Sequence, residues 1–223
     1  MSEKLRILIT GFGPFPGARF NPTPALVARL ATLRRPAFTD ATRIAHVFPV
    51  SYGAVDRELP QLLARYRPDA LLMFGLAGRT DHVRIETRAR NAVTTTFPDA
   101  DRKVARNGSI VDGADAMLFG PHTERLLRAA LATGIDARPS RDAGSYLCNY
   151  LSWRAIEATR NAQVNAQGPR LAAFVHVPPL PREPAMRKNA AGITLEDMVD
   201  AGEAMLLELV KLARQAQREE LNA

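Results

Sequence analysis

Four short apolar runs alternate with longer amphipathic segments along this chain, and this alternation restricts its fold more than any other feature. The runs occupy residues 5–10, 43–50, 70–74 and 171–177. Each has the length of a buried strand, whereas the segments between them repeat apolar side chains at helical spacing. The pattern predicts an α/β fold, with three layers, α/β/α, around a mostly parallel, twisted central sheet.

Proline, glycine and cap-forming residues mark the remaining elements. Pro60 is expected to distort or restart the helix at 52–67, and Thr194 to cap the last helix. Residues 83–96 alternate in polarity, which favours an extended segment with one polar face. The Pro, Gly, Asn and Asp between 97 and 120 predict a long loop. Other predicted elements are helices at 21–34, 122–133, from about 148 and at 194–221, a hairpin tip at 106–109, a strand at 135–138 and a proline-rich loop at 178–193.

Length and composition favour one soluble globular domain spanning residues 1–223. Apolar residues make up 46% and charged residues 24% of the chain, and no internal repeat, low-complexity linker or change of composition divides it. The N-terminal residues lack the apolar core of a signal peptide, and no window is long and apolar enough to span a membrane. We therefore expect a cytoplasmic protein without a membrane contact.

The formal net charge of +7 raises the question of a nucleic-acid partner. The basic residues are spread along the whole chain and are interleaved with Asp and Glu. No zinc-finger, leucine-zipper or basic–aromatic RNA-binding pattern occurs. We therefore expect no nucleic-acid partner.

The only cysteine, Cys148, stands where a helix is expected to begin. Asp142 or Ser145 could cap this helix, and Gly144 allows the chain to turn sharply into it. Unpaired N–H groups and the positive end of the helix dipole favour an anion there, so such a cysteine can be a nucleophilic thiolate. A small buried core residue is the alternative, and position alone leaves both open. A lone cysteine also excludes an intramolecular disulfide and a zinc site built from several thiolates.

Two further residues could complete a nucleophilic centre with Cys148. His176 lies at the carboxyl end of an apolar run, and ligand sites gather at this end of the strands in open α/β sheets. Glu86 is one of several carboxylates in the alternating segment. A cysteine peptidase or amidase needs a thiolate, an imidazole that moves protons, and a group that holds the imidazole. The sequence supplies all three, and a core histidine and a solvated glutamate remain the alternatives.

Short blocks of sequence, spread over nearly the whole chain, carry a family resemblance. The strongest are Ala-Gly-Ser-Tyr-Leu-Cys-Asn-Tyr at 143–150 and Phe-Val-His-Val-Pro at 174–178. The others are Ile-Thr-Gly-Phe-Gly-Pro-Phe at 9–15 and the blocks at 21–23, 48–51 and 84–91. In this order they resemble the pyroglutamyl peptidase I (pyrrolidone-carboxylate peptidase) family of cysteine peptidases.

This resemblance implies a reaction and roles for particular residues. The reaction is removal of an N-terminal pyroglutamate from a peptide through a thioester acyl-enzyme, without a metal or organic cofactor. Cys148 is implied as the nucleophile, His176 as the general acid and base, and Glu86 as the carboxylate beside the imidazole. By analogy with relatives, a homo-oligomer, dimer or tetramer, is also expected. The implied substrate-binding residues are Phe12, Phe15, Leu76 and Asn21, with core packing as the alternative role of the two aromatic rings.

The chain departs from the family pattern at two places near the implied site. Family members commonly carry an arginine, thought to assist the active site, where this chain has Thr96; Arg88 or Arg90 could substitute from nearby. Many members carry glutamine at the position of Leu76, so this chain lacks an amide in the ring-binding region. Two alternatives to the implied reaction therefore stay open. They are an amidase for a different small acyl or cyclic substrate, and a weakly active paralogue that binds a ligand or partner.

Overall fold

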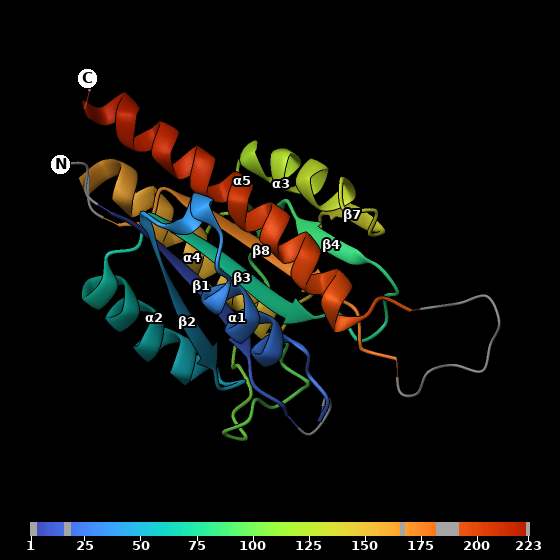
Figure 1. Cartoon of the computed structure of the whole chain (residues 1–223). Helices are drawn as coiled ribbons and strands as arrows, with labels where there is room; N and C mark the ends of the chain where they lie inside the picture. Colours follow the sequence, from blue (N-terminus) through green and yellow to red (C-terminus); the bar gives the residue numbers. More distant parts are fainter. Residues whose placement is uncertain (1–3, 16–18, 166–167, 182–191, 222–223) are drawn as a thin grey trace.

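A six-stranded sheet forms the centre of the computed structural model, which describes residues 4–15, 19–165, 168–181 and 192–221 (Figure 1). The strand order is β2-β1-β3-β8-β4-β7. Four of the neighbouring pairs are parallel, and only β4 and β8 run antiparallel to each other. The mostly parallel sheet predicted from the sequence is therefore confirmed. The strands are β1 Leu5–Phe12, β2 Ala41–Phe48, β3 Ala70–Leu76, β4 Val83–Glu86, β7 Ala137–Ser140 and β8 Leu171–Val177.

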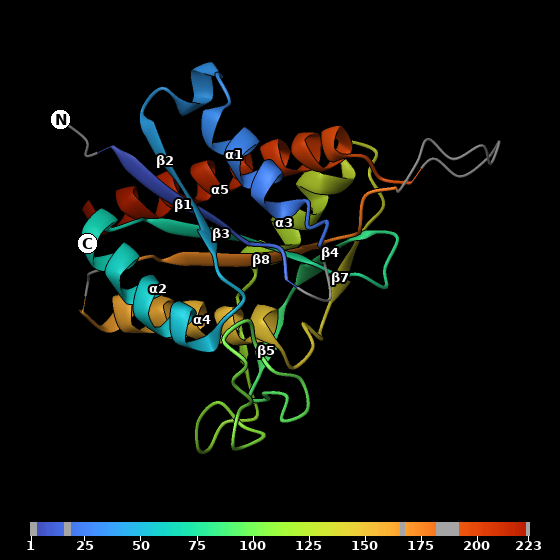
Figure 2. The ribbon, with the colours of Figure 1, turned by 90° about the horizontal axis from the view of Figure 1, so that it is seen from below.

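Helices cover both faces of this sheet and give the three predicted layers (Figure 2). Successive strand residues point to opposite faces, so Ile7 and Ile9 enter one apolar core while Leu8 enters the other. The first core is covered by α1 Thr23–Thr32, α3 His122–Leu131 and α5 Leu195–Leu221, and the second by α2 Tyr52–Tyr66 and α4 Leu147–Asn165. A short 3₁₀ helix, η1, spans Pro36–Phe38.

Two predictions about helix boundaries have different outcomes. Pro60 was expected to distort or restart α2; the helix does not restart there, because Tyr52–Tyr66 is one helix that contains the proline. The proline lies on the exposed side, where water can solvate the carbonyl that loses its N–H partner. The predicted cap of α5 is confirmed: Thr194 Oγ1 accepts the N–H of Asp197 at 3.2 Å, and the Asp197 carboxylate accepts the N–H of Thr194 at 2.8 Å.

The extended segment predicted at 83–96 begins with strand β4, and the polar side of this strand is turned into the protein. Strand β4 pairs with β8 on one side and with β7 on the other, so it lies inside the sheet. Glu86, at its end, is fully buried. A solvated glutamate was the alternative left open by the sequence, but Glu86 instead meets Arg84 at 3.2 Å.

The predicted loop at 97–120 also contains a strand. β6 Ala116–Leu118 pairs antiparallel with β5 Arg88–Arg90, so a long excursion joins the two strands. The pairing of β5 with β6 ends at Arg90 and Ala116, and residues 106–109 lie in the long excursion between these two residues. The tight hairpin tip expected at 106–109 is therefore absent.

The short strand predicted at 135–138 is β7, two residues further along the chain. Most of the proline-rich loop predicted at 178–193 lies outside the described residues. Within the described part of the chain, no helix combines the length and apolar character needed to cross a bilayer.

Candidate active site

His176 and Glu86 meet inside the sheet. They come from neighbouring antiparallel strands, β8 and β4, and the imidazole Nδ1 lies 2.8 Å from Glu86 Oε1. The histidine is 5% exposed and the glutamate 0%. A buried carboxylate that accepts the Nδ1 proton fixes the orientation of the ring and leaves Nε2 to exchange a proton with another group. Glu86 is thus in contact with the imidazole, as the family resemblance implied, and is not a solvated strand residue.

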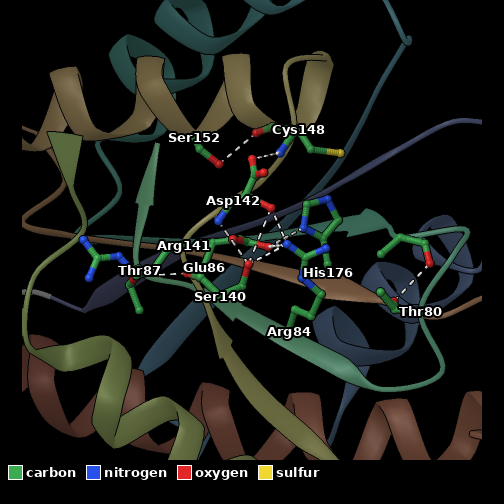
Figure 3. Close-up of polar contacts among 12 residues, drawn as sticks. Thr80, Arg84, Glu86, Thr87, Ser140, Arg141, Asp142, Cys148, Ser152 and His176 are labelled. Atoms are coloured by element: carbon green, nitrogen blue, oxygen red, sulfur yellow. Dashed lines mark hydrogen bonds and ion pairs between the residues drawn. The ribbon is translucent and has the colours of Figure 1, made fainter. Parts of the chain in front are cut away.

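Cys148 reaches the same place from a helix, in the first turn of α4. Its sulfur lies against the end of β3: a Cβ atom on Gly75 would be only 2.7 Å from Cys148 Sγ. Gly75 pairs in register with His176, so the missing side chain leaves room for the sulfur on the strand next to the imidazole. Figure 3 shows Cys148 on the helix, with His176 and Glu86 on the strands beside it. Cys148 is partly exposed, which leaves it accessible to a substrate.

The charges around His176 outweigh the effect of its burial. Burial by itself lowers the pKa of an imidazole, but the Cys148 thiolate, through its charge and a hydrogen bond, and the Glu86 carboxylate together raise the pKa of His176 to about 9. The ring is therefore an imidazolium at neutral pH. An imidazolium between a carboxylate and a thiolate is the arrangement that activates a cysteine nucleophile.

The turn before α4 prepares the main chain around Cys148. Asp142 was one of the two residues expected to cap the helix, but it does not do so. Its Oδ1 instead accepts the N–H of Gly144 at 2.9 Å within the turn. Gly144 has a φ of +82°, which confirms the sharp turn predicted there. The first helical hydrogen bond runs from the Tyr150 N–H to the Tyr146 carbonyl at 3.0 Å. The N–H of Cys148 precedes that bond, so it is a donor available to an oxyanion.

The two arginines considered as substitutes for the family arginine bind this same turn. Arg88 Nε donates to the carbonyl of Arg141 at 2.7 Å, and Arg90 Nη2 donates to the carbonyl of Gly144 at 3.4 Å. Thr96, at the position of the family arginine, is exposed. Both guanidinium groups therefore support the main chain in front of α4, and direct assistance to a substrate remains a prediction.

The predicted substrate-binding residues differ in their surroundings. The Phe15 ring lies 6.2 Å from that of Tyr146, two residues before the cysteine. Leu76 ends β3 and is partly exposed. Phe12 is 3% exposed and packs in the core, with its ring centroid 6.1 Å from that of Phe48. Phe15 and Leu76 are therefore better placed than Phe12 to meet a ligand.

Asn21 holds the loop that carries these aromatic residues. Its Nδ2 donates to the carbonyls of Phe12 at 2.9 Å and of Gly13 at 3.3 Å, and its Oδ1 accepts the N–H of Thr23 at 3.0 Å. The main chain thus engages both ends of the amide. Asn21 shapes the loop by these bonds, and its direct contact with a substrate remains a prediction.

A cavity of about 830 Å³ lies elsewhere in the protein. It opens between α2 and α4 near the start of β1, where Leu59, Leu63 and Lys4 help to line it. None of the candidate catalytic residues contributes to its wall. Among the described residues, no group of three or more His, Cys, Asp or Glu side chains is arranged to hold a metal ion.

Comparison with known proteins identifies the family. The family model described as pyroglutamyl peptidase matches residues 5–211, a span that includes Glu86, Cys148 and His176. The chain belongs to the pyroglutamyl peptidase family. As a member of this family it is 31% identical to the pyrrolidone-carboxylate peptidase of Pyrococcus furiosus, over 97% of this chain and 100% of that relative. It is likewise 31% identical to the pyrrolidone-carboxylate peptidase of Gloeobacter violaceus, over 93% of this chain and 97% of that relative.

Solved structures agree with this membership of the pyroglutamyl peptidase family. The pyrrolidone carboxyl peptidase of Thermococcus litoralis superposes with a TM-score of 0.80 at 26% identity, over 95% of this chain and 96% of that one. The enzyme of the same name from Fervidobacterium islandicum gives a TM-score of 0.78 at 28% identity, over 93% of this chain and 99% of that one.

Two residues of the site were not found from the sequence. Gly75 was not singled out as a site residue, although glycine marks places where another atom approaches the backbone closely. Asn149 is fully buried and ties α4 to β5: its Oδ1 accepts the N–H of Arg90 at 2.8 Å, and its Nδ2 donates to the carbonyls of Arg90 and Ala92 at 2.8 and 2.9 Å. Its place directly after the cysteine in the strongest family block was the available signal.

Proposed function

We propose that this chain is a thiol peptidase that removes N-terminal pyroglutamate from peptides, with Cys148, His176 and Glu86 as its catalytic residues. The observation that supports it most is the meeting of the three side chains from three elements, with the Nδ1–Oε1 contact at 2.8 Å and the sulfur against Gly75. Family membership and the names of the relatives supply the reaction class and the substrate. The chemistry uses only side chains and main-chain groups.

The reaction proceeds in two steps. The Cys148 thiolate attacks the carbonyl carbon that joins pyroglutamate to the next residue, and the oxygen becomes an oxyanion. Main-chain N–H groups at the start of α4 stabilise that charge, and the loss of one such donor typically costs about 10²–10³-fold in rate. The His176 imidazolium protonates the departing amine, which leaves a thioester. The neutral imidazole then takes a proton from water, and the resulting attack releases pyroglutamate and restores the thiolate.

The ring of the substrate suits the residues near the sulfur. Pyroglutamate is a small, flat, neutral lactam, which apolar and aromatic walls with a few main-chain hydrogen bonds can hold. Phe15 and Leu76 supply such surface, and Phe12 backs it from the core. Asn21 contributes by fixing the loop. Because Leu76 cannot hydrogen-bond as an amide would, recognition of the lactam rests more heavily on main-chain groups.

Three broader expectations belong to this proposal. Residues 1–223 form one domain, since helices on both faces pack on the same sheet. The protein works in the cytoplasm, where a single cysteine stays reduced. It acts as a homo-oligomer, and gel filtration with light scattering would measure the assembly directly.

Hydrolysis of a fluorogenic pyroglutamyl amide under reducing conditions tests the function. The wild type should release the fluorophore, and Cys148→Ser should lower kcat/KM by about 10⁴-fold or more, as removal of a nucleophile does in related mechanisms. Wild-type turnover no better than that of Cys148→Ser on any amide would leave only a binding role. Turnover of other acyl amides, with none of the pyroglutamyl amide, would instead identify an amidase for another substrate.

A further inference from the structure

Arg84 lies between the catalytic side chains and the turn that leads to the cysteine. On β4 it pairs in register with His176 of β8 on one side and with Arg138 of β7 on the other. Its Nη2 lies 3.2 Å from Glu86 Oε1 and donates to Ser140 Oγ at 2.5 Å (Figure 3). The same nitrogen also donates to the carbonyl of Asp142. One guanidinium thus contacts both the sheet and the turn.

Arg84 and His176 are the two cationic side chains in contact with the carboxylate of Glu86 within the described residues. Its carboxylate is 0% exposed, and Oε1 is shared between His176 Nδ1 and Arg84 Nη2. Oε2 is also buried, and within the described residues no hydrogen-bond donor meets it. A buried carboxylate is costly unless cations and donors offset the loss of water. Arg84 is the cation next to Glu86 that does not take part in proton transfer.

The Arg84 guanidinium also holds the turn that precedes α4. Ser140 is the last residue of β7, and its carbonyl accepts both the N–H of Thr87 at 2.7 Å and the Thr87 hydroxyl at 2.9 Å. Arg84 adds a bond to the Ser140 hydroxyl and one to the Asp142 carbonyl. These contacts fix the path of the chain six to eight residues before Cys148, and hence the direction in which α4 begins.

We propose that Arg84 is a positioning residue for the reaction, which neutralises Glu86 and locks the turn before α4 in register with the Glu86–His176 pair. The inference rests on the proposed function. With the arginine present, carboxylate, imidazolium, thiolate and guanidinium carry two negative and two positive charges. Without it the buried group has one excess negative charge, and this excess disfavours a thiolate near the carboxylate.

The other charged groups near this cluster are engaged elsewhere. The carboxylate of Asp142 pairs with Arg90 Nε at 3.2 Å, and Arg138 pairs with Asp136 at 2.7 Å on the exposed edge strand. On the side of the helix, burial raises the pKa of Tyr146 above its ordinary value, so the phenol stays neutral. Arg84 is therefore the charge whose removal should change the titration of the centre.

The test compares Arg84→Met with Arg138→Met, its neighbour at the same register on β7. Iodoacetamide alkylation of Cys148 is followed against pH, alongside kcat and KM for the pyroglutamyl amide. In Arg84→Met the alkylation midpoint should move to higher pH by about one unit. Its kcat should fall about 10- to 100-fold with KM within about threefold, as for a catalytic group moved by roughly 1 Å. Arg138→Met should have the same alkylation midpoint, kcat and KM as the wild type.

A second variant covers the case in which Arg84→Met does not fold. Arg84→Lys keeps the charge but loses the planar fork, so its alkylation midpoint should stay near that of the wild type while kcat falls. An unchanged midpoint in a folded Arg84→Met, or wild-type kcat in Arg84→Lys, overturns the proposal. Alkylation needs no pyroglutamyl substrate. A protein that fails to cleave that substrate but shows the shifted midpoint contradicts the proposed function and not the role of Arg84.

Discussion

The pKa values of two buried histidines, His122 and His176, are shifted in opposite directions. His176 is 5% exposed and His122 is 8% exposed. His176 Nδ1 meets the carboxylate of Glu86 at 2.8 Å, whereas His122 Nε2 lies 2.8 Å from the main-chain carbonyl of Ala172, on the same strand β8. Burial lowers the pKa of His122, whereas Cys148 and Glu86 overcome burial and raise the pKa of His176 to about 9.

The difference shows that burial does not decide what a histidine does. A carbonyl can orient an imidazole but offers no full charge to hold its proton, so His122 stays neutral and structural. A carboxylate on one side and a thiolate on the other keep His176 protonated, which is the state that the proposed mechanism requires of an acid for the leaving amine. The same residue type thus has two roles, set by the charge of its partners.

The largest expected effect comes from exchanging each histidine for glutamine. His176→Gln should lower kcat/KM for the pyroglutamyl amide by about 10⁴-fold, because no proton donor remains for the leaving group. His122→Gln keeps an N–H that can reach the Ala172 carbonyl and should leave kcat/KM within about threefold. Steady-state kinetics of the two variants checks this, and equal losses would erase the distinction between the two sites.

Glu86→Gln gives His176 a neutral partner, like that of His122. We expect kcat to fall by about 10²- to 10⁴-fold, the range seen when the orienting carboxylate of a hydrolase triad is replaced. The pKa of His176 should also fall, because one of the charges that raise it is gone. The alkaline limb of the kcat profile, near pH 9 in the wild type, should therefore move to lower pH. A limb that does not move would show that Glu86 acts by geometry alone.

Gly75→Ala tests the contact between the sulfur and the strand next to His176. The added Cβ would lie 2.7 Å from Cys148 Sγ and 2.7 Å from the Phe174 ring, so both must move. We expect kcat to fall about 10- to 100-fold and stability to fall by about 1–3 kcal/mol. Gly78→Ala, two residues beyond β3 with no heavy atom within 4 Å, is the matched control and should be neutral. Equal activity of the two variants would contradict the close approach.

The smallest effect concerns His122 and acid stability. Its pKa is lowered in the folded state, so below about pH 6.5 the unfolded chain binds more protons than the folded one, and stability falls as the pH falls. His122→Gln should remove that part of the acid-induced loss. Urea denaturation measures the free energy of unfolding at pH 5 and at pH 7.5. The loss of this free energy between pH 7.5 and pH 5 should be smaller in the variant than in the wild type. An identical difference would mean that His122 is not held neutral by the fold.

The layers and the candidate catalytic residues could be predicted from the sequence, because apolar periodicity and short family blocks are local signals. Cys148, His176 and Glu86 were found in this way. The burial of Glu86 could not be predicted, because the antiparallel insertion of β4 beside β8 leaves no mark in the alternating residues themselves. The closeness of Gly75 to the sulfur and the bonds of Arg84 to the turn depend on strand register, which spacing along the chain does not encode.

Titration of the His176 ring by nuclear magnetic resonance, in the wild type and in Cys148→Ser, is the most direct test of the thiolate–imidazolium centre. The wild-type ring should titrate with a midpoint near 9, and the serine variant should titrate at clearly lower pH, because the thiolate is the strongest of the influences that raise the pKa. A wild-type midpoint at or below 6.5, or the same midpoint in both proteins, would contradict it.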